Sequence, residues 1–130
     1  VHENWETLTA QYQFISLQQV NSRDIGDLIP EKTNFFISQS AIEHFEEDLT
    51  FFRQMRQYIG RMQQPVVQIH HFPPKIHFRI SPLHGVRQYC PRTIAKITRL
   101  FDDENSYSIL FNLGGNECNM LHDQFITAPY

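Results

Sequence analysis

The sequence predicts an α+β fold, in which a pair of strands, one long helix and a series of short strands follow one another. Apolar and polar residues alternate in several short segments, as they do in half-buried strands. Over 41–63, apolar residues instead recur every three or four positions, as on one face of a helix. The chain has 130 residues, of which 41% are hydrophobic, so one composite domain with a packed core is expected.

The N-terminal part, 1–40, predicts two strands. The segments 14–20 (FISLQQV) and 33–39 (TNFFISQ) are rich in apolar and aromatic residues, as strands are. A loop that contains Gly26 and Pro30 separates them. Because the two strands follow each other across one loop, an antiparallel pair is predicted.

The long helix, 41–63, is the clearest element. Ser40 and Glu43 fit a capping box, in which each side chain accepts a hydrogen bond from a free backbone N–H group. Acidic residues lie at the start of this segment and arginines near its end, which suits the helix dipole. Pro65 is expected to end the helix. The predicted apolar stripe consists of Ile42, Phe45, Leu49, Phe52, Met55, Ile59 and Met62.

The C-terminal part, 65–130, predicts a meander of short strands. Residues 107–113 alternate between apolar and polar side chains, with Leu110 as the exception, which is typical of a half-buried strand. The acidic stretch 102–105 before it and Gly-Gly-Asn at 114–116 after it are turn-forming sequences. Further short strands are predicted at 66–69, 76–80 and 117–121.

Residues 94–101 allow two interpretations. We predict a strand, because the strand that follows and the turn between them are strong signals. However, Ile94, Ile97 and Leu100 are spaced by three, so a short helix stays open as the alternative.

Composition narrows the functional classes. The net charge is −3, whereas nucleic-acid-binding domains usually carry an excess of basic residues. Two cysteines, Cys90 and Cys118, make neither a disulfide framework nor a four-ligand zinc site, and an intracellular location is expected. No apolar run approaches the roughly 18 residues of a membrane span.

Catalysis and metal binding are not predicted. The sequence carries no local signature of a Ser-His-Asp or Cys-His arrangement, so we expect no enzyme and no cofactor. His70 and His71 are adjacent and would point to opposite faces of an extended segment, which makes a shared metal ion improbable.

Two motifs of the C-terminal part resemble those of a Tudor core. Residues 89–94 (YCPRTI) stand where a Tudor core has W-Y-R-A-x-V, and 109–116 (ILFNLGGN) stand at its V-x-F-x-D-Y-G-N strand and turn, where Phe111, Gly115 and Asn116 match. With the upstream strands and helix, this order resembles an extended Tudor domain, the Tudor–staphylococcal-nuclease composite of piRNA-pathway scaffold proteins.

The resemblance implies a division of the chain into three parts. Residues 1–40 would be a partial nuclease-like strand pair and 41–64 the linker helix. The Tudor core would occupy 65–130, with a small SH3-like β-barrel at about 66–125.

The resemblance also implies a binding site for arginine. Such domains hold a methylated arginine in an aromatic cage by cation–π contact. Phe111 matches one cage ring, and Asn116 matches the asparagine that holds the guanidinium. Cys90 and Gly114 stand where two other rings would be, although Tyr89 is aromatic. We therefore expect a degenerate cage; the peptide-binding residues would be Tyr89, Phe111, Asn116, Phe78 and Tyr107.

The function that the resemblance implies is a non-catalytic peptide-binding module. It would recognise an arginine-containing tail, that of a PIWI-class Argonaute, with little dependence on arginine methylation, in the cytoplasm or in perinuclear germline granules. Two alternatives stay open. One is a β-barrel that binds single-stranded nucleic acid, for which a basic region offers Arg87, Arg92, Lys96 and Arg99. The other is a structural or self-associating domain, in which the aromatic residues are simply core.

Overall fold

A computed structural model of the chain describes residues 7, 9–12, 14–73, 87, 89–122 and 124–125. It confirms a small mixed α+β architecture. The elements are, in order, α2 (Ile25–Leu28), β1 (Phe35–Gln39), the short 3₁₀ helix η1 (Ile42–His44), α3 (Asp48–Ile59), β2 (Val67–His71), α4 (Pro91–Thr98), the 3₁₀ helix η3 (Arg99–Phe101) and α5 (Asn116–His122).

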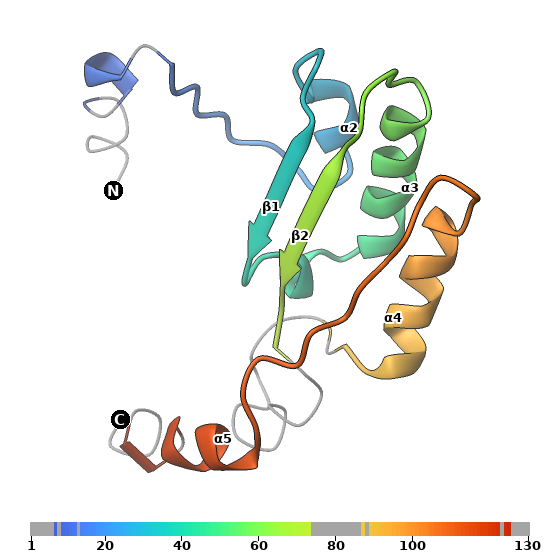
Figure 1. Ribbon diagram of the computed structural model, residues 1–130. Coiled ribbons are helices and arrows are strands. Elements are labelled where there is room, and N and C mark those ends of the chain that lie inside the picture. Colours follow the sequence, from blue (N-terminus) through green and yellow to red (C-terminus); the bar gives the residue numbers. More distant parts are fainter. Residues whose placement is uncertain are drawn as a thin grey trace.

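The centre of the fold is a β-α-β unit. β1 and β2 pair in parallel, with Phe35 opposite Val67 and Ile37 opposite Ile69. Parallel neighbours need a crossover of a dozen or more residues, and α3 supplies it behind the two strands (Figure 1). The predicted antiparallel pairing of 14–20 with 33–39 is therefore wrong: β1 pairs with β2, and 14–20 forms no strand.

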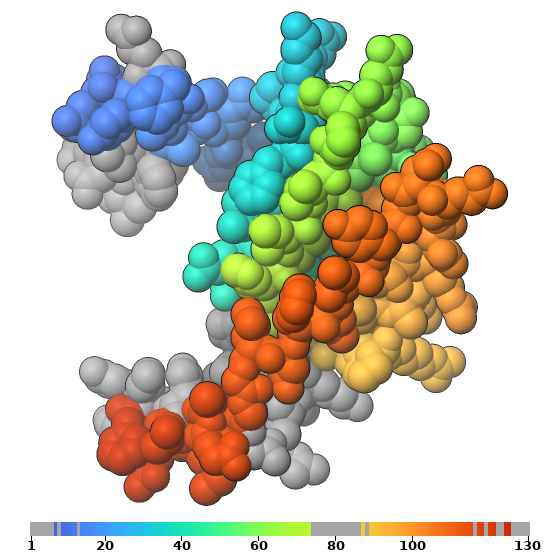
Figure 2. Space-filling view, in the orientation of Figure 1, coloured from blue at the N-terminus to red at the C-terminus, as the bar shows by residue number. Residues whose placement is uncertain are grey.

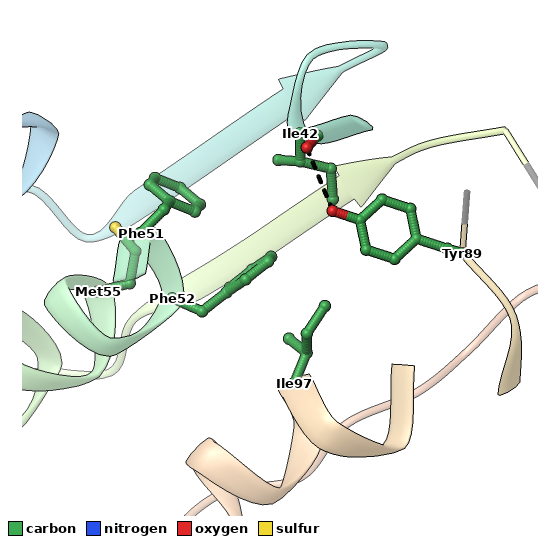
Figure 3. Close-up of a cluster of buried hydrophobic side chains, with 6 residues drawn as sticks. All are labelled: Ile42, Phe51, Phe52, Met55, Tyr89 and Ile97. Carbon is green, nitrogen blue, oxygen red and sulfur yellow. Dashed lines mark hydrogen bonds between the residues drawn. The ribbon is translucent and has the colours of Figure 1, made fainter. Parts of the chain in front are cut away.

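The core lies between this sheet and the helices. Its buried apolar residues come from η1, α3, α4 and the residues just before α4 (Figure 3). In α3, Phe51 and Phe52 stack edge to face, with ring centroids 5.1 Å apart. Phe52 also meets the His70 ring of β2 at 5.1 Å, so α3 is held against the sheet. The set is Ile42, Phe51, Phe52, Met55, Tyr89 and Ile97.

The helix between the strands is shorter than predicted. α3 begins at Asp48, and the predicted start, 42–44, is a separate 3₁₀ turn. Ser40 has a positive φ of 47°, whereas an N-cap residue adopts an extended backbone, so the predicted capping box does not form. Glu43 lies in η1 and is buried.

The predicted strand at 94–101 is wrong, and the alternative of a short helix is correct. α4 begins with Pro91, a residue that suits the first helical position because it lacks the N–H that would have no partner there. Ile97 of α4 reaches the core. The predicted strand at 117–121 is also wrong, because these residues belong to α5.

The remaining strand predictions have mixed outcomes. The apolar run predicted at 66–69 is largely β2. Residues 107–113 are not assigned to a strand. The strand predicted at 76–80 lies outside the described residues. The sheet formed by the described residues has two strands, so the SH3-like barrel and the three-part division stay predictions. No helix in the described part of the chain has the length and apolar character needed to cross a membrane.

Candidate protein-docking surface

In the described part of the chain, one face of the sheet is apolar and exposed. Side chains alternate along a strand, and Phe36 and His70 contact α3, so their neighbours point away from that helix. We call these neighbours, Phe35, Ile37, Val67 and Ile69, the open face; they are 52%, 60%, 53% and 40% exposed. Figure 2 shows the side chains of β1 and β2 at the surface on this side of the molecule.

The open face is more apolar than the face that α3 covers. The covered face carries Phe36, Ser38, Gln68 and His70, and Ser38 Oγ lies 2.8 Å from His70 Nδ1; the exposed side adds Gln39 and His71 at the carboxyl ends of the strands. Parallel sheets normally have both faces covered, because their crossover helices lie on the faces of the sheet. Contiguous exposed apolar patches mark places where another protein surface docks. The open face is therefore the main candidate for a binding surface.

The strand edges add a second binding property. In the part of the chain that the structure describes, the sheet has two strands, so each strand has one edge without a strand partner. The backbone N–H and C=O groups on such an edge can pair with an added strand. An extended peptide could thus bind with its backbone on an edge and its side chains on the open face.

The start of α3 presents acidic groups to a guanidinium. Arg23 lies 3.0 Å from a carboxylate oxygen of Glu47 and 3.5 Å from one of Glu46. All three side chains are well exposed, and exposed pairs of this kind contribute at most about 1 kcal/mol. The pair Glu46–Glu47 therefore accepts an arginine side chain and can exchange it.

A buried polar cluster joins the start of α3 to the residues before α4. Asp48 is 1% exposed; its carboxylate forms an ion pair with the Arg87 guanidinium and accepts a hydrogen bond from the Tyr89 hydroxyl, both at 3.0 Å. The Tyr89 hydroxyl also lies 3.2 Å from the Ile42 carbonyl oxygen (Figure 3). Burial, and after it the Asp48 carboxylate, raise the pKa of Tyr89, so the hydroxyl stays protonated and donates. The cluster holds the fold together, and the sequence patterns did not identify it.

The five predicted binding residues lie in different environments. Tyr89 is 2% exposed and packs in the core against Phe72, with ring centroids 4.5 Å apart. Tyr107 and Phe111 are 87% and 73% exposed on an extended segment, so they do not form one aromatic cage with the buried Tyr89. Asn116 is the first residue of α5. Phe78 lies outside the described residues.

His70 of β2 lies against aromatic core residues and has a structural role. His70 packs against Phe51 and Phe52, and burial, followed by the neighbouring His71, lowers its pKa to about 4. It is therefore neutral at pH 7. Within the described residues, no group of three or more His, Cys, Asp or Glu side chains is placed to hold a metal ion.

Comparison of this chain with known proteins found no relative. No family model matches the sequence, and neither a curated protein nor a solved structure does.

Proposed function

We propose that this chain is a non-catalytic protein-binding module that takes up an extended, arginine-containing segment of a partner. The observation that carries the proposal is the open face, formed by Phe35, Ile37, Val67 and Ile69 beside strand edges with which no other described strand pairs. The partner segment would add a strand to the sheet and place alternate apolar side chains on the open face.

The arginine preference has support from the acidic start of α3. Glu46 and Glu47 already bind the guanidinium of Arg23 in an exposed pair, which a partner arginine could replace. Complementary charge of this kind contributes more to specificity and association rate than to affinity. The resemblance to extended Tudor domains favours the N-terminal tail of a PIWI-class Argonaute as the partner.

We further propose that methylation of that arginine has little effect. Discrimination needs several rings around the cation, each contributing about 0.5–2 kcal/mol. Tyr89 is buried, and Tyr107 and Phe111 lie exposed on one segment, which favours an incomplete cage. The docking surface needs only the pairing of β1 with β2, so it does not require the rest of 66–125 to close into a Tudor-like barrel.

A non-catalytic role has support from the buried cluster. Asp48 is, with Glu43, one of the two buried carboxylates among the described residues, and Arg87 and Tyr89 occupy it. Its Oδ1 also accepts the backbone N–H of Leu49 at 2.8 Å. A carboxylate with this set of partners is positioned to stabilise the fold, and we propose neither a cofactor nor a metal.

Calorimetry with a matched peptide pair tests the proposal. The probe is a short peptide in which arginines alternate with apolar residues, prepared with unmethylated and with symmetrically dimethylated arginine. We expect both forms to bind within about threefold of each other. A preference of tenfold or more for the methylated form, equal to about 1.4 kcal/mol, would show that a functional cage exists.

Variants locate the peptide on the molecule. The pair Ile37→Ser and Ile69→Ser lies on the open face; because the two side chains are 60% and 40% exposed and lie in strands, each substitution should cost about 1 kcal/mol or less. We expect peptide affinity to fall at least tenfold. Leu28→Ser is the matched control, since Leu28 is equally apolar and 47% exposed but lies on α2. Unchanged affinity in the open-face pair would refute the docking surface.

Self-association is the second candidate, because the open face carries no charged residue and could pack against its own copy. Light scattering on the free protein tests it. A dimer that the open-face pair dissociates, together with no peptide binding, would favour this candidate. Binding to single-stranded RNA with a steep dependence on salt concentration would instead favour a nucleic-acid-binding function.

A further inference from the structure

We infer that residues 107–113, which make no backbone hydrogen bond to β2 in the structure, close onto the free edge of β2 as a third, parallel strand. The inference concerns the unliganded chain and does not depend on the proposed function. It assigns an occupant to one of the two edges that the described sheet leaves without a strand partner.

The side chains of this segment suit a strand. Tyr107, Ile109, Phe111 and Leu113 alternate with Ser108, Leu110 and Asn112, and all the apolar members are exposed. Seven extended residues span about 23 Å, which exceeds the roughly 16 Å of the five-residue strand β2. The segment is thus long enough to pair with all of β2. Covering its apolar side chains would be energetically favourable.

Contacts at both ends of α4 fix the direction of the chain. At the start of α4, Tyr89 bonds to Ile42 and Asp48, which follow the carboxyl end of β1. Beyond the end of α4, Asp103 pairs at 2.7 Å with Arg56, which lies in the last turn of α3 and therefore near the amino end of β2. α4 thus runs opposite to the strands, and 107–113 return in the direction of β2, as Figure 1 shows.

The connection also selects the edge. Ile97 of α4 shares the core with Phe52 and Met55 of α3, so both helices cover the same face of the sheet. The crossover from β1 through α3 to β2 is right-handed in Figure 1, as such crossovers almost always are. A second right-handed crossover on that face, through α4, places the next strand beside β2, on the side away from β1.

This third strand changes what is left for a partner. Residues 107–113 would occupy the free edge of β2. The outer edge of β1, which also borders the open face, would then stay free. If the proposed function holds, the partner segment adds to β1. An open parallel sheet of this kind also differs from an SH3-like barrel, whose neighbouring strands are antiparallel.

Hydrogen exchange measured by nuclear magnetic resonance on the free protein tests the inference. An edge strand donates hydrogen bonds through every second N–H group, so successive amides of 108–112 should alternate between slow and fast exchange, differing more than tenfold. Nuclear Overhauser contacts to 67–71 should pair residues whose numbers rise together. Uniformly fast exchange, or contacts in the antiparallel order, would overturn the inference. Neither result depends on whether any peptide binds.

Two proline variants give a second test. Proline removes one backbone N–H, and the N–H groups of residues 109 and 110 point to opposite sides of a strand. With Ile109→Ala and Leu110→Ala as references for the lost side chains, one of Ile109→Pro and Leu110→Pro should lower the melting temperature by several degrees more than the other. Equal effects of the two proline variants would contradict pairing along one edge.

Discussion

Replacing Tyr89 with phenylalanine separates a structural role of this residue from a ligand-binding role. The variant keeps the ring that packs against Phe72 and removes the hydroxyl that bonds to Asp48 and to the Ile42 carbonyl. A hydrogen bond to a charged group contributes about 1.5–3 kcal/mol, and both acceptors are buried, so little water can replace the lost donor. We expect the free energy of unfolding to fall by about 2 kcal/mol.

For a chain of this length, that loss corresponds to a melting temperature about 7 °C lower. Chemical denaturation and thermal unfolding, both followed by circular dichroism, measure the effect. Tyr107→Phe is the matched control: it removes the same hydroxyl from a side chain that is 87% exposed, and it should leave stability unchanged. The reasoning is refuted if Tyr89→Phe is as stable as the parent chain while its affinity for the arginine peptide drops tenfold, since Tyr89 would then face the ligand.

Two further predictions concern the core and its histidine. Met55→Ala should destabilise the fold by about 2–5 kcal/mol, because Met55 is fully buried, whereas Met120→Ala, at an exposed position of α5, should cost almost nothing in the same denaturation assay. Stability should also depend on pH through His70: its pKa is about 4 in the folded state and about 6.5 when unfolded, so the unfolded chain binds the proton more readily. The stabilisation is fully present above about pH 6.5 and should decrease by up to about 3 kcal/mol as the pH falls to 4. His70→Asn should remove most of this dependence, and a slope that persists in that variant would assign the effect to other groups.

The local patterns predicted some elements and missed others for identifiable reasons. Phe52 and Met55 belong to the predicted apolar stripe, and they do face the core from a helix. The start of the helix was misplaced because the serine-to-glutamate spacing matched a capping box, whereas Ser40 adopts a left-handed backbone. In α4, the spacing of Ile94 and Ile97 by three and the proline at position 91 indicated a helix. A strand was predicted instead because the turn sequence that follows was given more weight.

Long-range pairing could not be predicted from alternation. A strand pattern at 33–39 is the same whether its neighbour precedes it or follows it across a helix, and the structure selects the second arrangement. For the candidate site, aromatic character identified Tyr89, Tyr107 and Phe111 but not their surroundings. Burial separates Tyr89 from the other two, and burial depends on which elements pack together. The open face was missed because alternation predicts which side chains share a face of a strand, but not whether another element covers that face.

Chemical-shift mapping with the unmethylated arginine peptide tests the central claim most directly. Amide resonances of the protein would be followed by nuclear magnetic resonance during a titration. The proposal predicts that the largest shifts occur along β1, at Val67 and Ile69, and at Glu46 and Glu47, while the amides of α5 move little. Shifts confined to α5 and 107–113, or no shifts at a peptide concentration of several hundred micromolar, would contradict the claim that the open face binds an extended arginine-containing partner.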